Sequence, residues 1–512
     1  MALDEVLTRR TGQGSSPPTL RFLRFKPDAA LLGYHQEAAR ELRLDYCAAE
    51  GIEVNRRLTG GGALLFQSSA LGWELIAPLG SGPFRGGFEA ALTRICQAAA
   101  RGLARLGLEA RFRPRNDIEV DGRKVSGTGG MVLEGGALFQ GTVLVRNQIG
   151  RFLRALRVPV EKLKKREIDS LMQRMAFLED LLGRELDLAE LKEAFVREFS
   201  ESLGMTLVPG QLSPEEQGEL AQRLPYFRSE EWLQLKRAPS GRPDWLRSVS
   251  HCEGGYLSAH LWLDRRGTRV QKALITGDFF SQPQRLVMDL EAALMGCRAE
   301  PAEVGRKVRE FLDQAGGGLS GISSAEVERA VAMATERRGL AASFSPQEAA
   351  ELFLAGMAPA QVGSLPASWL LLPYCAKPVG CEWRERPGCG LCGGCDLHGL
   401  HELARELGLT PVTIQSFEHL MAVLQRVARS GRPYLGSCCE AFYCKHQREM
   451  ESSGAGGVLV NLDSTTCYDL GKGMEAYAGR FDHQTSLNLA LVEKAARLMA
   501  QGSARAVAVN HA

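Results

Sequence analysis

Two arginines followed by three glycines form the first segment with clear chemical potential. The sequence RRLTGGGA spans residues 56–63. Successive glycines add nothing to a core and cost backbone entropy, so they are expected where the backbone approaches a ligand and offers N–H groups to phosphate oxygens. The guanidinium of Arg57 beside them is suited to bidentate, charge-assisted hydrogen bonds with a polyphosphate. The segment therefore predicts an anion site, although the glycines alone would also fit a plain hairpin turn.

A second polar segment, NDIEVDGRKVSGTGG, spans residues 116–130. Its Asp121-Gly122 pair is a strong signal for a tight hairpin turn and places Lys124 just beyond the turn. A lysine in that position is usually an ordinary surface residue. Because Asn116 precedes it and small polar residues follow it, we instead predict a polar, glycine-rich surface beside the first loop.

Cysteines are unevenly distributed along the chain. Only four of the 13 precede residue 300, namely Cys47, Cys96, Cys252 and Cys297. The other nine are Cys375, Cys381, Cys389, Cys392, Cys395, Cys438, Cys439, Cys444 and Cys467. Gaps of two residues let neighbouring thiolates face one metal ion or cluster, so this part of the chain predicts a metal centre. Nine thiols exceed the four ligands of a usual zinc site, which favours an iron–sulfur cluster and leaves zinc as the alternative.

The elements that must position these residues are visible in the periodicity. Apolar or alternating runs at residues 20–25, 30–33 and 52–54 predict short strands around the glycine segment. Apolar residues at helical spacing predict a helix from Phe88 to Leu106. Strand, glycine loop, strand and helix together indicate an α/β arrangement.

The cysteine-rich part has a pattern of its own. Apolar runs at residues 411–414, 432–436 and 457–460 alternate with helical segments, one of them at residues 419–428. Strand–helix alternation predicts a small parallel sheet, and sites in such sheets lie at the carboxyl ends of the strands. We therefore expect the cysteines to lie at that edge.

The length of 512 residues predicts three or four domains. Turn-forming residues near 240 and between 340 and 368 suggest the boundaries. We expect a first domain over 1–240, a second over 241–340, a linker over 341–365 and a cysteine-rich domain over 366–512. The predicted fold class is α/β.

The overall composition excludes several function classes. The net charge of +2 gives no indication of nucleic acid or an anionic membrane as a partner. No apolar run reaches about 18 residues, and the first residues lack the features of a signal peptide. We expect a cytoplasmic protein, in which cysteines stay reduced rather than forming structural disulfides.

Together the two polar segments resemble the active site of lipoate–protein ligases. That family has an Arg-Arg-x-Thr/Ser-Gly-Gly-Gly-Ala motif, then Asn-Asp and Gly-x-Lys-Ile/Val-Ser-Gly, matched here by residues 56–63, 116–117 and 122–127. A His/Gln-Gly-Thr strand follows in the family, and Gln140-Gly141-Thr142 matches it here. The resemblance covers roughly two thirds of the chain and implies an α+β catalytic domain with a mixed sheet over 1–240, followed by a small accessory domain over 241–340. Residues 277–280 and the helices after them carry the resemblance of the second domain.

The resemblance also implies an activity and its participants. Enzymes of this family join lipoate to ATP, release pyrophosphate and transfer the acyl group from lipoyl-AMP to a lysine of a lipoyl-carrier domain. Lys124 would be the catalytic residue that bridges the acyl carbonyl and the α-phosphate, and Asp117 would bind Mg²⁺. The residues implied in ligand binding are Arg57, Gly60, Gly61, Gly62, Ala63, Leu64, Leu65, Asn116, Asp117, Lys124 and Ser126. Residues 158–165 and 170–174 resemble the adenylate-binding loop and the helix after it.

Alternatives within the superfamily remain open. Octanoyltransferases share the fold but pass the acyl chain from a carrier thioester through an enzyme cysteine, and neither Cys47 nor Cys96 lies where such a nucleophile is expected. Biotin ligases carry a glycine- and arginine-rich loop that is not found here. Phe66 stands where the ligases usually have histidine, which leaves the choice between lipoate and octanoate open. A non-catalytic protein that binds lipoyl domains is the remaining alternative.

The C-terminal part resembles an uncharacterised prokaryotic cysteine-rich domain. The motif that carries this resemblance is Leu372-Pro373-Tyr374-Cys375. Because the activity of that domain is unknown, the resemblance implies no function. The predicted fold of this part remains a small cysteine-rich α/β domain.

Overall fold

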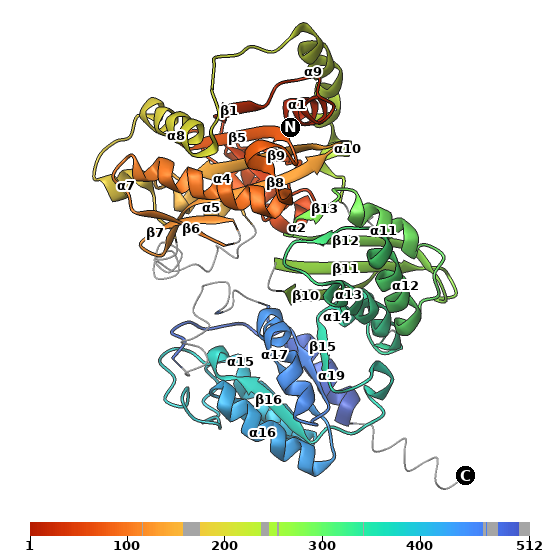
Figure 1. The fold of residues 1–512 in the computed structure, drawn as a ribbon. Helices are drawn as coiled ribbons and strands as arrows, with labels where there is room; N and C mark the ends of the chain where they lie inside the picture. Colours follow the sequence, from red (N-terminus) through yellow and green to blue (C-terminus); the bar gives the residue numbers. More distant parts are fainter. Residues whose placement is uncertain are drawn as a thin grey trace.

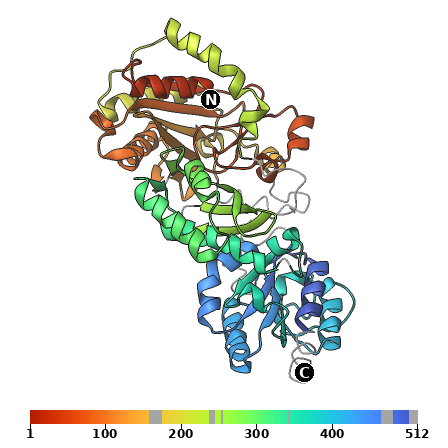
Figure 2. The ribbon, with the colours of Figure 1, turned by 90° about the vertical axis from the view of Figure 1, so that its right-hand side faces the viewer.

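The computed structural model describes residues 1–114, 116–156, 175–236, 245–252, 255–340, 342–463, 467 and 480–500, and leaves a few side chains within these ranges undescribed, that of Cys444 among them. The segments expected to bind the adenylate, 158–165 and 170–174, lie outside the described residues. Figures 1 and 2 show three successive parts, with the N-terminal and C-terminal parts on either side of the middle one. No helix in the described ranges is long and apolar enough to cross a bilayer.

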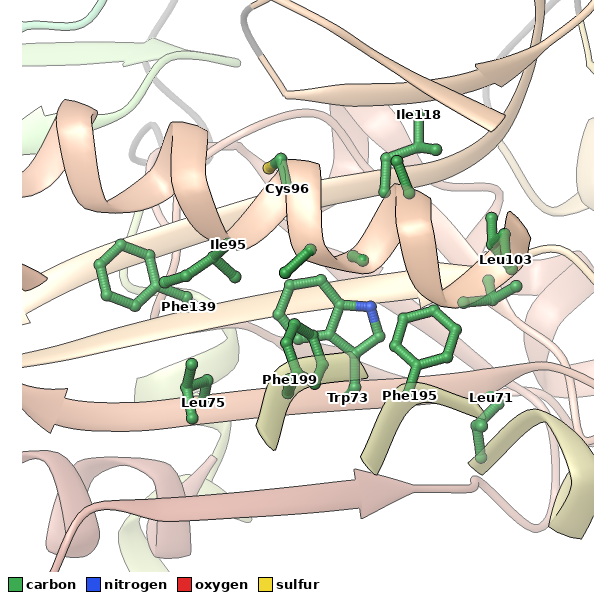
Figure 3. Close-up of a cluster of buried hydrophobic side chains, with 14 of the residues drawn as sticks. Leu71, Trp73, Leu75, Ile95, Cys96, Leu103, Ile118, Phe139, Phe195 and Phe199 are labelled. Atoms are coloured by element: carbon green, nitrogen blue, oxygen red, sulfur yellow. The ribbon is translucent and has the colours of Figure 1, made fainter. Parts of the chain in front are cut away.

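A six-stranded antiparallel sheet forms the centre of the N-terminal part. The strand order is β1 (Thr19–Leu23), β5 (Leu71–Pro78), β9 (Gly136–Val143), β8 (Arg123–Leu133), β7 (Asp117–Val120) and β6 (Ala110–Arg113). Helices α4 (Gly87–Ala104) and α8 (Leu188–Leu203) pack on one face, where Trp73 contacts Phe195 and Phe199 (Figure 3). Helix α1 (Ala2–Gly12) packs on the other face through Leu7.

A smaller sheet supports the glycine segment. Strand β2 (Ala29–Leu32) pairs in parallel with β3 (Glu53–Arg56) and antiparallel with β4 (Leu64–Phe66). The three glycines connect β3 to β4, as expected from the strand–loop–strand pattern. The remaining elements of this part are α2 (Ala38–Glu41), α3 (Leu44–Ala49), η1 (Gly82–Phe84), α5 (Ile149–Ala155), α7 (Leu178–Leu182), α9 (Pro214–Phe227) and α10 (Glu230–Leu233).

The hairpin predicted at Asp121-Gly122 is confirmed. Strands β7 and β8 pair antiparallel across the turn, with Val120 opposite Arg123. Both turn residues have positive φ, 50° for Asp121 and 71° for Gly122. This conformation matches the twist of the flanking strands, and Gly122 adopts it without a steric cost. The turn thereby fixes the position of Lys124.

The middle part contains an antiparallel sheet covered by helices. Its strands are β10 (Trp245–Cys252), β11 (Gly255–Leu263) and β12 (Val270–Gly277), with a short pair β13 (Ser281–Gln282) and β14 (Gly318–Leu319). The helices are α11 (Leu286–Leu294), α12 (Pro301–Gln314), α13 (Ser324–Glu336) and η3 (Arg337–Leu340). Ser323 and Glu326 form a capping box at the start of α13, which satisfies N–H groups that have no partner within the helix. This part has its own apolar core.

The C-terminal part is a five-stranded sheet of order β15-β19-β18-β16-β17. Its strands are β15 (Leu352–Ala355), β16 (Trp369–Pro373), β17 (Thr410–Ile414), β18 (Tyr434–Ser437) and β19 (Gly457–Val460). All except β15 are parallel, which confirms the predicted parallel sheet. The helices are α14 (Pro346–Ala350), η4 (Pro359–Gln361), η5 (Tyr374–Ala376), α15 (Asp396–Glu406), α16 (Phe417–Ser430), α17 (Glu440–Ser452) and α19 (Leu489–Ala500). Two apolar clusters cover the two faces of the sheet.

The segment expected to be a linker, 341–365, differs from that expectation. Leu352–Ala355 forms β15, an edge strand paired antiparallel with β19. Four consecutive apolar residues explain the difference, because they gain more from burial against the sheet than from exposure in a connection. In addition, buried Arg337 donates to the carbonyl oxygen of Leu352 at 2.5 Å, which joins this segment to the middle part.

Candidate active site

A cavity of about 550 Å³ lies beside the glycine segment. We call it the catalytic cavity. Of the predicted ligand-binding residues, those that line it are Arg57, Gly60, Gly61, Gly62, Ala63, Leu64, Leu65, Asn116 and Lys124. Asp117 and Ser126 do not line it. Ser126 is fully buried, whereas Asp117 lies directly behind Lys124. The structure thus brings both predicted polar segments to one site.

Arg57 supports the backbone of the glycine segment. Its guanidinium donates to the carbonyl oxygens of Leu31 at 2.8 Å, Gly60 at 3.2 Å and Gly62 at 2.9 Å. Burial lowers the pKa of Arg57 to about 10, so the group still carries its charge at neutral pH. The positive charge therefore lies at the loop, while the hydrogen bonds hold the loop in shape. The geometry assigns Arg57 a bracing contact in addition to the ligand contact predicted from the sequence.

Arg56 has a different set of partners. It is fully buried and donates to the carbonyl oxygens of Gly33, Tyr34, Gln36, Trp232 and Leu233. These carbonyls belong to the segment after β2 and to α10. The two adjacent arginines thus have separate tasks, because only Arg57 contacts the glycine loop.

Lys124 lies on β8 just after the hairpin turn and forms an ion pair with Asp117 of β7. Its Nζ lies 2.6 Å from Oδ1 of Asp117, and its side chain is 38% exposed. A Cβ on Gly127 would come within 3.0 Å of Nζ, so a larger residue there would displace the lysine. Asn116 is fixed nearby by a hydrogen bond of 2.9 Å to the carbonyl oxygen of Thr128. The ion pair therefore holds the amine in place at the cavity that Lys124 lines.

The middle part of the chain contributes to the same site. Phe280 lines the catalytic cavity, and the N–H of Gly61 donates to the carbonyl oxygen of Phe279 at 3.2 Å. A Cβ on Gly60 would lie 2.1 Å from that same oxygen, so only glycine allows this approach. This close contact explains why Gly60 is a glycine, because the residue packs against the middle part of the protein. Residues 277–280 were expected only as part of the accessory domain.

A polar row crosses the cavity floor, and of its members only Gln140 belonged to a motif recognised in the sequence. Arg21, Glu74 and Gln140 are direct cross-strand neighbours on β1, β5 and β9. Arg21 Nε donates to Glu74 at 2.9 Å, and Thr59 Oγ1 donates to Gln140 at 2.5 Å. Burial raises the pKa of Glu74 to about 7. The pairing partners lie far apart in sequence, so only the strand register could have identified them.

Apolar side chains complete the cavity. They include Leu23, Phe25, Leu31, Phe66, Leu144 and Phe177. Phe66, which stands where the ligases usually have histidine, packs against Phe25 with ring centroids 4.6 Å apart. One cavity thus combines a cationic, glycine-rich end with an apolar wall. This combination suits a molecule with a charged head and a hydrocarbon chain.

The comparisons agree with this geometry. The family model described as "Lipoyl protein ligase A/B catalytic domain" matches residues 1–200. Octanoyltransferase LipM of Symbiobacterium thermophilum is 31% identical over 241 residues, which cover 43% of this chain and 87% of the relative. The chain belongs to the lipoyl protein ligase A/B family.

Two further relatives are named for two different reactions. Octanoyltransferase LipM of Moorella thermoacetica is 29% identical over 260 residues, covering 46% of this chain and 93% of the relative. Lipoate-protein ligase LplJ of Bacillus subtilis is 26% identical over 271 residues, covering 53% of this chain and 78% of the relative. The N-terminal part is thus a catalytic domain of the lipoate ligase and octanoyltransferase type, and similarity alone does not choose between the two reactions.

The lipoyl ligase-type domain holds two cysteines, and neither lines the catalytic cavity. Cys96 lies on α4 inside the apolar core (Figure 3), and burial raises its pKa to about 12. Cys47 is also fully buried, and burial raises its pKa as well. Both thiols are therefore protonated and inaccessible, as expected of structural cysteines.

The nine cysteines outside the lipoyl ligase-type and middle parts form two groups, apart from Cys444. One group, Cys375, Cys438, Cys439 and Cys467, lines a cavity of about 110 Å³, which we call the cysteine-lined cavity. The other group, Cys381, Cys389, Cys392 and Cys395, lies on the segment between η5 and α15. Within the described ranges, no three His, Cys, Asp or Glu side chains meet in an arrangement that could hold a metal ion. The predicted metal centre remains a prediction.

Proposed function

We propose that this chain is an ATP-dependent lipoate–protein ligase. Its substrates would be lipoate or octanoate, ATP and a lysine of a lipoyl-carrier domain. The observation that carries the proposal is a catalytic cavity with a positioned lysine and no thiol among its described lining residues. A transferase that accepts the acyl chain from a thioester needs an activated nucleophile at the reacting carbon. Cys47 and Cys96 are buried and protonated, and neither can serve.

The proposed reaction has two steps. A carboxylate oxygen of lipoate first attacks the α-phosphorus of ATP, the bond to the β-phosphate oxygen breaks, and pyrophosphate leaves. The neutral ε-amine of the acceptor lysine then attacks the acyl carbon of lipoyl-AMP. An amide forms, AMP leaves, and the amine loses one proton. Neither step requires a covalent bond to the enzyme.

The residues of the cavity are suited to the first step. Negative charge grows on the oxygens around the α-phosphorus, and fixed positive groups in a cavity shielded from water stabilise it. Lys124 would bridge the acyl carbonyl and the α-phosphate, because it lines the same cavity as the glycine segment and Asp117 holds its Nζ in place. The charge of Arg57, held behind the loop by three backbone carbonyls, adds to the same field. The apolar wall around Phe25 and Phe66 would hold the hydrocarbon chain.

Asp117 is the residue that fits a magnesium ion accompanying ATP. Mg²⁺ prefers one or two carboxylates together with phosphate oxygens. The side chain of Asp117 is 28% exposed and contacts Lys124, which lines the cavity, although Asp117 itself does not. Bound there, the ion would neutralise charge on the phosphates, while Asp117 would at the same time keep Lys124 oriented.

The test is pyrophosphate release by the full-length chain with ATP, Mg²⁺ and lipoate. Acyl-adenylate formation and subsequent lipoylation of a lipoyl domain are the expected results, and Cys47→Ala and Cys96→Ala should retain both. Transfer from an octanoyl-carrier thioester without ATP, lost in one of these variants, would establish the transferase reaction instead. Binding of lipoyl domains with no product from either donor would identify a non-catalytic binding protein.

A further inference from the structure

The cysteine-lined cavity lies at the carboxyl edge of the parallel C-terminal sheet. Cys375 follows β16, and Cys438 and Cys439 follow β18 directly. Cys467 comes from the segment after β19 and lines the same cavity. In open parallel sheets this edge is where ligands bind, because the connections leave a crevice there. Residues from three separate strand ends thus bring four thiols to one place.

Two buried hydroxyl groups accompany the thiols. Tyr434 and Ser437 line the cavity with 1% and 6% of their surfaces exposed. Neither hydroxyl oxygen has a hydrogen-bond partner among the described residues. The ring of Tyr434 cannot turn away easily, because it packs directly against the backbone of Gly457, where a Cβ would clash with it. Buried hydroxyls without partners cost free energy, which indicates a ligand that accepts hydrogen bonds.

The remaining wall is mainly apolar and uncharged. Pro373, Ile414, Phe417, Phe442 and Leu462 line it, together with the uncharged polar side chains of Gln415, Ser416 and Thr485. Among the described residues, no acidic or basic side chain lines it. Such a lining does not suit phosphate or a hydrated cation, both of which need charged or numerous polar partners. Thiol sulfur is a soft ligand that selects zinc, copper(I) or iron–sulfur clusters. The ligand therefore binds through sulfur and has acceptor atoms facing the two hydroxyls.

The spacing of the thiols discriminates between these soft ligands. A single zinc ion draws all its sulfurs to about 2.3 Å from one point. The described cysteines instead surround a cavity of about 110 Å³ and do not converge in threes on one position. A cluster of several irons and sulfides lies between its cysteines and keeps them apart. Its sulfides also accept hydrogen bonds, as Tyr434 and Ser437 require.

We propose that the cysteine-lined cavity binds an iron–sulfur cluster through Cys375, Cys438, Cys439 and Cys467. Each thiol releases one proton as its sulfur binds iron. Tyr434 and Ser437 are positioning residues that donate hydrogen bonds to cluster sulfides. Thr485 supplies a further donor, because its Oγ1 lies 3.2 Å from the sulfur of Cys375. The site belongs to the C-terminal sheet and requires nothing of the ligase reaction.

The other group of thiols is held by a different set of contacts. Lys377, which is buried, donates to the carbonyl oxygens of Trp383 at 2.5 Å, Arg386 at 2.8 Å and Gly388 at 2.6 Å. These bonds shape the segment that carries Cys381, Cys389, Cys392 and Cys395. None of those four lines the cysteine-lined cavity. The cluster proposed here is therefore assigned to the first group alone.

The first experiment measures iron, acid-labile sulfide and zinc in the full-length chain purified without oxygen. We expect iron and sulfide in equal amounts, and loss of at least half of both in Cys375→Ala and Cys467→Ala. Cys96→Ala is the matched control, because it removes a buried thiol outside the cavity. Circular dichroism shows whether each variant is folded. Iron retained in folded Cys375→Ala, zinc in place of iron, or a folded wild type without metal would each overturn the proposal.

The second experiment tests the hydroxyls without disturbing the thiols. Tyr434→Phe keeps the ring and removes only the donor, so iron content should stay at the wild-type level. Hydrogen bonds to sulfur stabilise the reduced, more negative cluster. Its midpoint potential should therefore become more negative in Tyr434→Phe. The cluster whose midpoint potential changes must be the one whose paramagnetic signal is absent from Cys375→Ala. An unchanged potential would contradict the placement of the cluster in this cavity.

Discussion

The catalytic cavity and the cysteine-lined cavity differ in what satisfies their polar groups. In the first, the charged side chains have protein partners, because Arg57 binds three backbone carbonyls and Lys124 pairs with Asp117. Only the uncharged Trp73 Nε1 and Thr128 Oγ1 there lack a partner among the described residues. In the second, the hydroxyls of Tyr434 and Ser437 are buried without a partner among the described residues. A site that exchanges substrates must keep its shape when empty, because its ligands leave in every cycle. A site for a resident cofactor can leave its last contacts to the cofactor.

The two cavities also differ in how they are assembled. The catalytic cavity combines the six-stranded sheet, the glycine segment and Phe280 from the middle part. The described residues that line the cysteine-lined cavity all belong to the C-terminal sheet and its connections. Changes at one site should consequently leave the other intact, and this independence can be tested from both sides.

The largest expected effect is the loss of acyl-adenylate formation in Lys124→Ala. Removing one charged contact to the transition state should slow pyrophosphate release with ATP and lipoate on the order of 10²–10³-fold. Arg123→Ala is the matched control, since this neighbouring cation does not line the cavity. Iron and sulfide content should equal that of the wild type. Near-normal turnover in Lys124→Ala would refute its role, and a loss of metal would refute the independence of the two sites.

Removing the proposed cluster should have the second largest effect. Metal binding in such sites contributes directly to folding free energy. We expect a chelator, or oxidation in air, to lower the melting temperature of the C-terminal part by roughly 5 °C or more, which corresponds to a few kcal/mol in a domain of this size. Calorimetry of the full chain measures this shift. Acyl-adenylate formation should persist after the same treatment, and its loss would mean that the C-terminal part supports the catalytic cavity.

Arg57→Lys tests whether the glycine segment depends on its brace. A lysine lacks the planar guanidinium group that donates to three carbonyl oxygens. The loop should therefore relax, while one positive charge remains. We expect kcat/KM for ATP to fall roughly 10–100-fold, equivalent to about 1.4–2.7 kcal/mol. Arg56→Lys provides the comparison, because its acceptors lie at residues 33–36 and 232–233. That variant should lose thermal stability with a smaller change in kcat/KM, and equal kinetic losses would contradict the separate roles.

Local signals made the glycine segment, the Asp121-Gly122 hairpin and the parallel C-terminal sheet predictable. Each depends on neighbours in sequence: backbone freedom, turn preference or the alternation of apolar runs. Contacts between distant segments were not predictable in this way. Phe279 closes over Gly60 from more than 200 residues away along the chain. Leu352–Ala355 joins the sheet only through its partner β19, and a short apolar run in a turn-rich segment does not reveal that partner.

The smallest expected effect concerns Glu74, whose strand neighbours also could not be read from the sequence. Burial raises the pKa of Glu74 from 4.5 to about 7, so the folded chain keeps this proton at a pH where the unfolded chain has lost it. Between those values the folded state binds more protons, and its stability must fall as pH rises.

Glu74→Gln retains an oxygen that accepts from Arg21 but cannot ionise. Compared with wild type, its melting temperature should therefore improve steadily from pH 4.5 to 7 and level off above. Thermal unfolding of both proteins across this range measures the difference between their melting temperatures. If that difference does not change with pH, Glu74 is ionised throughout the range. Because Glu74 lies on the cavity floor beside Gln140, the same titration would report whether charge enters the catalytic cavity near neutral pH, a change that the cysteine-lined cavity should not sense.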